Sequence, residues 1–230
     1  MNNPFSKYQI ATAIAILFHL IGLSGILFFN MDFFVHSTPF NLLLMLALLI
    51  WTQAKKNHWF WIFLIACFIT GIGVEMVGVN TGILFGNYRY GDVLGSQLKN
   101  VPLLIGVNWF IIIYCIGISI HTLLLRIIKS LPADANPRFT TLKILSVTVD
   151  GATLAVIFDW LMEPVAVKLD YWHWSGDGSV PPYNYICWFL VSILLLVIFH
   201  FCKFEKQNKF AVNLLLIQVM FFLVLRTFMN

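Results

Sequence analysis

The chain contains seven apolar segments, and most of them reach the length of about twenty residues that a helix needs to cross a bilayer. They lie near Tyr8–Phe29, Phe40–Gln53, Trp59–Val79, Pro102–Leu125, Thr141–Glu163, Tyr183–Cys202 and Phe210–Met229. The second segment is short unless it also takes in Phe33, Phe34 and Val35. Lipid cannot satisfy backbone polar groups, so such segments fold as helices. The sequence predicts an all-α fold, a polytopic membrane helical bundle of about seven transmembrane helices, with a single integral-membrane domain over residues 1–230.

The low share of charged residues supports a membrane protein, and the positions of the basic residues predict its topology. Only 10% of the residues are charged, against about 25% in soluble domains. With seven spans, most basic residues fall on the side of the amino terminus: Lys7, Lys55, Lys56, Arg126, Lys129, Arg138, Lys143, Lys203, Lys206 and Lys209. By the positive-inside rule the amino terminus is predicted to be cytoplasmic. The net charge of +4 then follows from topology, and we expect no nucleic-acid partner.

Cysteine and histidine spacing gives no sign of a metal centre. All four cysteines lie in or at the ends of apolar segments without a CxxC spacing: Cys67, Cys115, Cys187 and Cys202. The six histidines are scattered. The pattern indicates neither a disulfide framework nor a zinc site, and we expect no metal and no cofactor.

Three carboxylates interrupt the apolar segments, and they are the candidate catalytic residues: Glu75, Asp159 and Glu163. A charged side chain at the centre of a membrane helix costs roughly 2.5 to 3.5 kcal/mol on insertion scales, so such residues usually face a bundle interior or a wet cavity. All three fall in the outer third of their segments. They can instead be structural, pairing with a basic residue of an outer loop such as Arg89 or Lys99.

Helical spacing places these acids on faces that should point into the bundle. Glu75 shares its face with Gly71 and Gly78, and small residues allow helices to approach closely in lipid. Asp159 and Glu163 are four residues apart on one face, and Pro164 is expected to end their helix. Burial and like charges both favour the neutral carboxyl group. We therefore expect at least one of the three to keep its proton at neutral pH and to act as a proton donor.

Aromatic residues gather at the same end of the predicted bundle. The candidate substrate-binding residues are Tyr88, Tyr90, Trp109, Trp160, Trp172, Trp174, Asn184 and Trp188. An interfacial aromatic belt would explain part of this set, Trp172 and Trp174 in particular. Trp109 and Trp160 should lie deeper. Aromatic faces stabilise cations by roughly 0.5 to 2 kcal/mol each, so an acid facing aromatic rings fits protonation of an alkene to a carbocation.

With these residues in place, the chain resembles the carotenoid biosynthesis membrane proteins, the family of the carotenoid 1,2-hydratases and the bisanhydrobacterioruberin hydratase of haloarchaea. The resemblance covers about half of the chain and is carried by Glu75, Gly78, Thr81-Gly82, Phe85-Gly86, Tyr88, Tyr90, Leu94-Gly95, Val101-Pro102, Trp109, Asp159, Glu163-Pro164, Trp172, Trp174, Asn184 and Trp188. It implies a hydro-lyase that adds water to the terminal 1,2 double bond of an acyclic carotenoid end and gives a tertiary alcohol. No cofactor is implied. The substrate would come from the lipid bilayer of a prokaryotic cytoplasmic membrane, and other carotenoid biosynthesis enzymes are candidate partners.

We also hypothesise a role for each residue; the resemblance itself does not assign the steps among the acids. Asp159 or Glu75 would donate the proton, and Glu163 would orient or deprotonate the attacking water. Asn184 would hold that water while aromatic rings shield the cation. Three alternatives stay open. They are an isomerase or desaturase of lipid end groups, a proton-coupled transporter with Asp150 deep in the bundle, and a non-catalytic carotenoid-binding protein.

Overall fold

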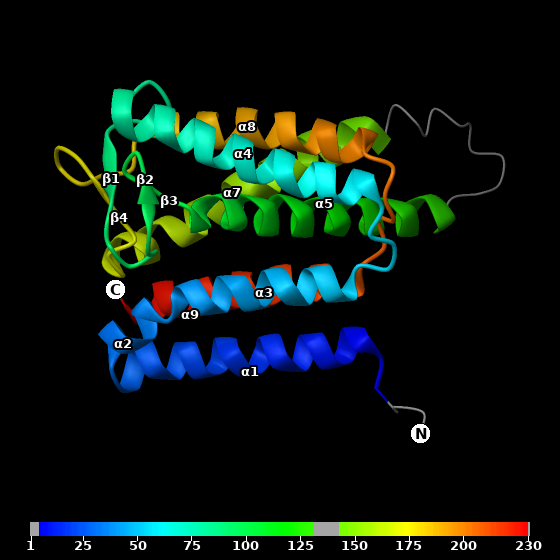
Figure 1. Ribbon diagram of the computed structural model, residues 1–230, viewed down its shortest axis with the longest axis horizontal. Helices are drawn as coiled ribbons and strands as arrows, with labels where there is room; N and C mark the ends of the chain where they lie inside the picture. Colours follow the sequence, from blue (N-terminus) through cyan, green and yellow to red (C-terminus); the bar gives the residue numbers. More distant parts are fainter. Residues whose placement is uncertain (1–4, 131–142, 230) are drawn as a thin grey trace.

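The computed structural model describes residues 5–130 and 143–229 and confirms the helical membrane architecture. Within these ranges seven helical segments are long and apolar enough to cross a membrane. They are α1 (Lys7–Phe28), α2 with α3 (Met31–His36 and Thr38–Thr52), α4 (His58–Thr81), α5 (Leu104–Ser130), the segment Lys143–Lys168, α8 (Pro182–Phe201) and α9 (Lys209–Phe228). The helices run side by side, and the start of α1 and the end of α9 lie at opposite ends of the bundle (Figure 1). The cytoplasmic placement of the amino terminus stays a prediction, and Arg138 and Thr141 lie outside the described residues.

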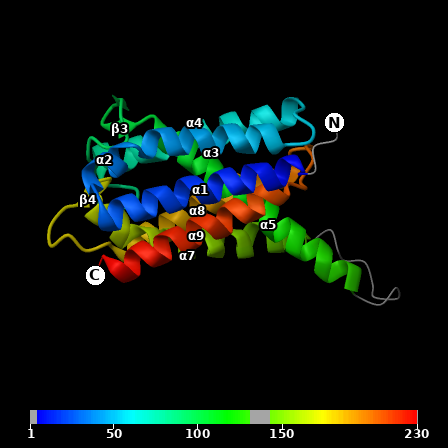
Figure 2. The same ribbon diagram turned by 90° about the horizontal axis from the view of Figure 1, so that it is seen from below.

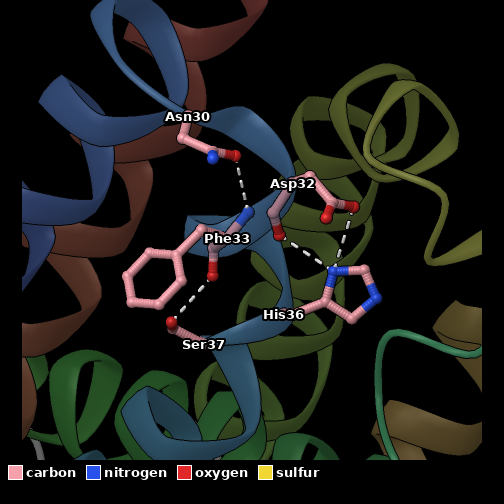
Figure 3. Close-up of polar contacts among 5 residues, drawn as sticks. All are labelled: Asn30, Asp32, Phe33, His36 and Ser37. Atoms are coloured by element: carbon pink, nitrogen blue, oxygen red, sulfur yellow. Dashed lines mark hydrogen bonds and ion pairs between the residues drawn. The ribbon is translucent and has the colours of Figure 1, made fainter.

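The second span is made of two helices, which explains why its apolar run looks short. Asn30 caps α2, with its side-chain oxygen accepting from the Phe33 N–H at 3.0 Å. The His36 ring closes α2 by donating to the Asp32 carbonyl at 2.8 Å, and the Ser37 hydroxyl donates to the Phe33 carbonyl (Figure 3). Together the two helices cover 22 residues, Met31–Thr52. The predicted start at Phe40 was therefore too late.

The fifth span corrects the prediction that Pro164 ends its helix. This span contains a π-helical turn, η1 (Ser146–Asp150), followed by α7 (Gly151–Lys168), with Pro164 inside the helix. Proline has no N–H for the carbonyl four residues earlier, which belongs to Trp160. The Arg226 guanidinium of α9 donates to that carbonyl at 2.7 Å instead. With the carbonyl satisfied, α7 continues one further turn.

The centre of the bundle is α5. Almost every residue from Ile105 to Ile118 is buried, on all sides of the helix, which is the pattern of a helix surrounded by other helices. Figures 1 and 2 show α3, α4, α7, α8 and α9 around it, while α1 lies on the outside against α3 and α9.

The described residues form four short strands, which lie at the end of the bundle opposite the start of α1 (Figure 1). Strand β1 (Tyr88–Tyr90) pairs antiparallel with β4 (Trp172–Trp174), and β2 (Gln97–Leu98) pairs with β3 (Val101–Pro102). No strands were predicted from the sequence, which indicated only loops between the apolar segments. We call this end of the molecule the strand end.

Candidate active site

A cavity at the strand end brings together nearly all of the candidate residues. It encloses about 30 Å³ of space in which the centre of a water molecule can lie. Since one water needs roughly 10 to 15 Å³ by this measure, the cavity has room for a few waters. The residues that line it come from α4, α5, α7, α8, the strands β1 and β4, and the loop between α4 and β1: Glu75, Phe85, Tyr88, Tyr90, Ile105, Asn108, Trp109, Asp159, Met162, Glu163, Trp172, Trp174, Asn184 and Trp188. We call it the acid cavity.

Glu75 accepts three hydrogen bonds inside the acid cavity. Its Oε2 accepts from the Tyr88 hydroxyl at 2.5 Å and from the Tyr90 hydroxyl at 2.7 Å. Its Oε1 accepts from the Trp109 indole Nε1 at 3.1 Å. Three donors to one carboxyl group hold it in place, and Glu75 is the acceptor in all three hydrogen bonds.

Glu163 accepts from two indoles, whereas Asp159 keeps one oxygen without a partner. The Nε1 atoms of Trp172 and Trp174 each donate to Glu163 Oε2 at 3.0 Å. Asn184 Nδ2 donates to Asp159 Oδ2 at 2.8 Å, but Asp159 Oδ1 is buried with no hydrogen-bond partner. A buried polar atom without a partner is costly, so this oxygen needs a proton, a water or a ligand.

The paired strands supply most of these donors. Tyr88 lies opposite Trp174, and Tyr90 lies opposite Trp172. Side chains alternate between the two faces of a strand, so these four residues share the face toward the acid cavity. Arg89 and His173, which lie opposite each other between them, occupy the other face. The Tyr-x-Tyr and Trp-x-Trp motifs thus form the two strands of one small sheet that covers the cavity.

Burial and the charge of Glu75 raise the pKa of both tyrosines, Tyr88 and Tyr90, above the ordinary value near 10. Both phenols therefore stay protonated at neutral pH and remain hydrogen-bond donors.

No Lys or Arg among the described residues forms an ion pair with the three acids, so the pairing with Arg89 or Lys99 considered above does not occur there. No group of three His, Cys, Asp or Glu in the same ranges is placed to hold a metal ion.

Stacked rings form the inner wall of the cavity. The rings of Trp109 and Trp188 are stacked at 4.2 Å between centroids, and Phe85 lies against Trp109. The glycines of α4 make room for this wall. A Cβ on Gly71 would lie 2.7 Å from the Trp109 ring, and one on Gly78 would lie 2.7 Å from the Tyr88 hydroxyl. The glycine face of this helix therefore points into the bundle beside Glu75, in keeping with the sequence pattern.

Trp160 is the one candidate that the structure does not bring to the cavity, and its predicted deep position is wrong. It is 52% exposed on the outer surface of α7, with the Arg226 guanidinium 3.9 Å from its ring centre. Successive residues of a helix are about 100° apart, so the residue after Asp159 leaves the face that Asp159 and Glu163 share.

Asp150 also lies away from the cavity, exposed on the π-helical turn, where it accepts from the Ser146 hydroxyl at 2.5 Å. It therefore does not lie deep in the bundle, as the transporter alternative requires. Four lining residues were not among the predicted site residues: Phe85, Ile105, Asn108 and Met162. Phe85 was named only in the Phe85-Gly86 motif of the resemblance, and Asn108 is a lone amide within an apolar segment. The apolar Ile105 and Met162 gave no signal.

Comparison with known proteins agrees with the resemblance seen in the sequence. The family model described as "Carotenoid biosynthesis protein" matches residues 36–230. A curated relative, the bisanhydrobacterioruberin hydratase of Haloarcula japonica, is 29% identical over 143 residues. That alignment covers 60% of this chain and 44% of the relative, so the match spans less than half of the relative's length. No solved structure matches the protein.

Proposed function

Since the chain belongs to the carotenoid biosynthesis protein family, we propose that it is a hydratase that adds water to the terminal 1,2 double bond of an acyclic carotenoid. The observation that carries this proposal is the unpartnered Oδ1 of Asp159 in a buried cavity lined by aromatic rings. The relative's name, a carotenoid hydratase, supports the reaction class.

Asp159 is the proton donor in this proposal. Glu75 already accepts from three donors, and Glu163 Oε2 accepts from two. Asp159 Oδ1 is buried and has no hydrogen-bond partner, so in this proposal it carries the proton and presents it to the substrate. Asn184 fixes the carboxyl group through Oδ2, which makes it a positioning residue for the acid and not the water-holding residue expected above.

The reaction transfers one proton and forms one carbon–oxygen bond. Asp159 protonates the CH carbon of the trisubstituted alkene, and the double bond becomes a tertiary cation at the neighbouring carbon. The rings of Trp109, Trp188 and Tyr88 face this charge and stabilise it. A water oxygen bonds to the cationic carbon, and Glu163 removes the proton that the water loses. The sum is alkene plus water to tertiary alcohol, and the proton on Glu163 returns to Asp159.

Membrane geometry agrees with this chemistry. The acid cavity lies at the strand end of the bundle, because residues of β1 and β4 line it, and the helices are long enough to cross the hydrocarbon core. An acyclic carotenoid about as long as that core is thick, about 30 Å, would present its end there. The cavity admits only a few waters as it stands, so binding of the branched end must displace lining side chains. We propose that the substrate comes from the bilayer of a prokaryotic cytoplasmic membrane, where other carotenoid biosynthesis enzymes are candidate partners.

The test is to express the chain in a host that accumulates lycopene and γ-carotene and to measure carotenoid masses. A product heavier by one water, labelled when heavy-oxygen water is supplied, is the expected result. A product of unchanged mass would indicate isomerisation, and one lighter by two hydrogens would indicate desaturation. Unchanged pigments beside well-inserted protein would contradict the hydratase for these substrates.

A further inference from the structure

A second chamber lies beside the acid cavity, between α1, α3, α5, α7 and α9. It offers about 80 Å³ to water centres, more than the acid cavity does. The two spaces share lining residues Ile105, Asn108, Met162 and Trp172, so only side chains separate them. Its other polar lining residues are His19, Thr38, Asn41, Tyr171 and Gln218.

Two buried oxygens of the second chamber are acceptors that lack a donor, and a ring nitrogen is a third acceptor. Gln218 is 7% exposed, and its Oε1 is buried with no hydrogen-bond partner; Asn41 Oδ1 is in the same situation. The His19 Nδ1 donates to the Ala15 carbonyl at 2.8 Å, which leaves Nε2 of a neutral ring as an acceptor. Three acceptors around one space call for a ligand rich in O–H donors.

Water satisfies this requirement better than a substrate hydroxyl does. One hydroxyl supplies a single donor, whereas each water supplies two and a chamber of this size holds several. Thr38 and Tyr171, which share a hydrogen bond of 2.7 Å, line the chamber together with Trp172 of β4, so the chamber extends to the strand end. Water can thus be held next to the acids without crossing the lipid.

We propose that the second chamber stores the water that captures the carbocation and that Asn108 passes it into the acid cavity. This inference rests on the proposed hydratase function. Water from the chamber bonds through its oxygen to the cationic carbon and gives its proton to Glu163. When no water arrives, the cation can only return a proton and become an alkene again. Gln218 and Asn41 are therefore positioning residues for water and take no part in protonating the alkene.

The test separates protonation from water capture by using heavy water. Purified full-length protein is incubated with lycopene in deuterium oxide, and two quantities are measured: deuterium in recovered lycopene and the amount of hydrated product. In Gln218→Leu and, separately, Asn41→Leu, we expect exchange to persist while the ratio of hydration to exchange falls roughly tenfold, the size that one lost hydrogen bond allows. Asn213→Leu is the matched control, because Asn213 is an amide of the same helix α9 that bonds Thr12 outside the chamber.

Two outcomes in the variants would overturn the inference. Hydration and exchange both at wild-type level would mean that the chamber supplies no water. Parallel loss of both in well-folded variants would mean that the chamber holds the hydrocarbon chain. If Gln218→Leu fails to fold, Asn41→Leu decides the matter alone. A wild-type protein with neither exchange nor hydration would overturn the proposed function, and the inference with it; this result is distinct from a defect confined to the variants.

Discussion

Tyr90 and Trp172 lie opposite each other in the β1–β4 pair and donate to different carboxylates, Tyr90 to Glu75 and Trp172 to Glu163. A single strand pair thus holds acids from two helices, α4 and α7. The third acid, Asp159, is held by Asn184 from α8. The three carboxyl groups are fixed by separate sets of donors, which allows them to take different roles in one cavity.

Asp159→Asn should reduce hydration by a factor of about 10² to 10⁴, the usual contribution of a general acid. The amide is isosteric and still fits beside Asn184, but it has no proton to give. The measurement is the initial rate of hydrated carotenoid formed per inserted protein. Asp150→Asn serves as the control, since it changes an exposed acid of the same span and should leave the rate unchanged. Activity within twofold of wild type in Asp159→Asn would rule out this residue as the proton donor.

Trp172→Phe and Trp174→Phe should each lower activity, with the double variant more impaired than either. Each change keeps an aromatic ring but removes one of the two N–H donors to Glu163 Oε2. A hydrogen bond to a charged group is worth about 1.5 to 3 kcal/mol, so the remaining donor cannot fully replace it. Turnover should fall more than apparent substrate affinity. Trp160→Phe is the matched control because Trp160 lies on the outer surface, and equal loss in all three variants would argue against this account.

Gly71→Ala should displace the Trp109 ring, whereas Gly73→Ala should be tolerated. The added methyl group at position 71 would lie 2.7 Å from that ring, while position 73 has no atom within 4 Å. Overpacking of this kind costs about 1 to 3 kcal/mol and would pull the indole Nε1 from Glu75. At position 73 the change should be neutral or stabilising by up to about 1 kcal/mol. Thermal unfolding in detergent and hydration rates would check both, and similar behaviour of the two variants would contradict the packing argument.

Because of Tyr171, the free energy of unfolding should fall as the pH rises from about 10 to about 12. Burial raises the pKa of its phenol to about 12 in the folded protein, whereas the unfolded value is about 10. The neutral phenol is favoured by folding, so its contribution is fully present below pH 10 and is lost as the pH rises to 12. Wild type should therefore lose unfolding temperature faster than Tyr171→Phe over this interval. Parallel curves for the two proteins would contradict the assignment, since the other tyrosines are common to both.

The apolar segments and the acid positions could be predicted because length, helical spacing and burial costs act locally along the chain. Gly71 and Gly78 on the face of Glu75 followed from the same spacing. The course of α7 past Pro164 could not be predicted, since it depends on Arg226 from α9 reaching the Trp160 carbonyl. The β1–β4 pair was equally inaccessible, because its two strands are far apart in sequence and each has only three residues.

The pairing of β1 with β4 also determines when the site can assemble during synthesis of the chain. Tyr88 and Tyr90 leave the ribosome directly after α4, but Trp172 and Trp174 follow only when α7 has been made. A chain halted between these points would have Glu75 and its tyrosine donors in the membrane with no opposing strand above them. Assembly of the site is therefore a late event of translation, and a truncated product that still inserts should be inert toward carotenoids.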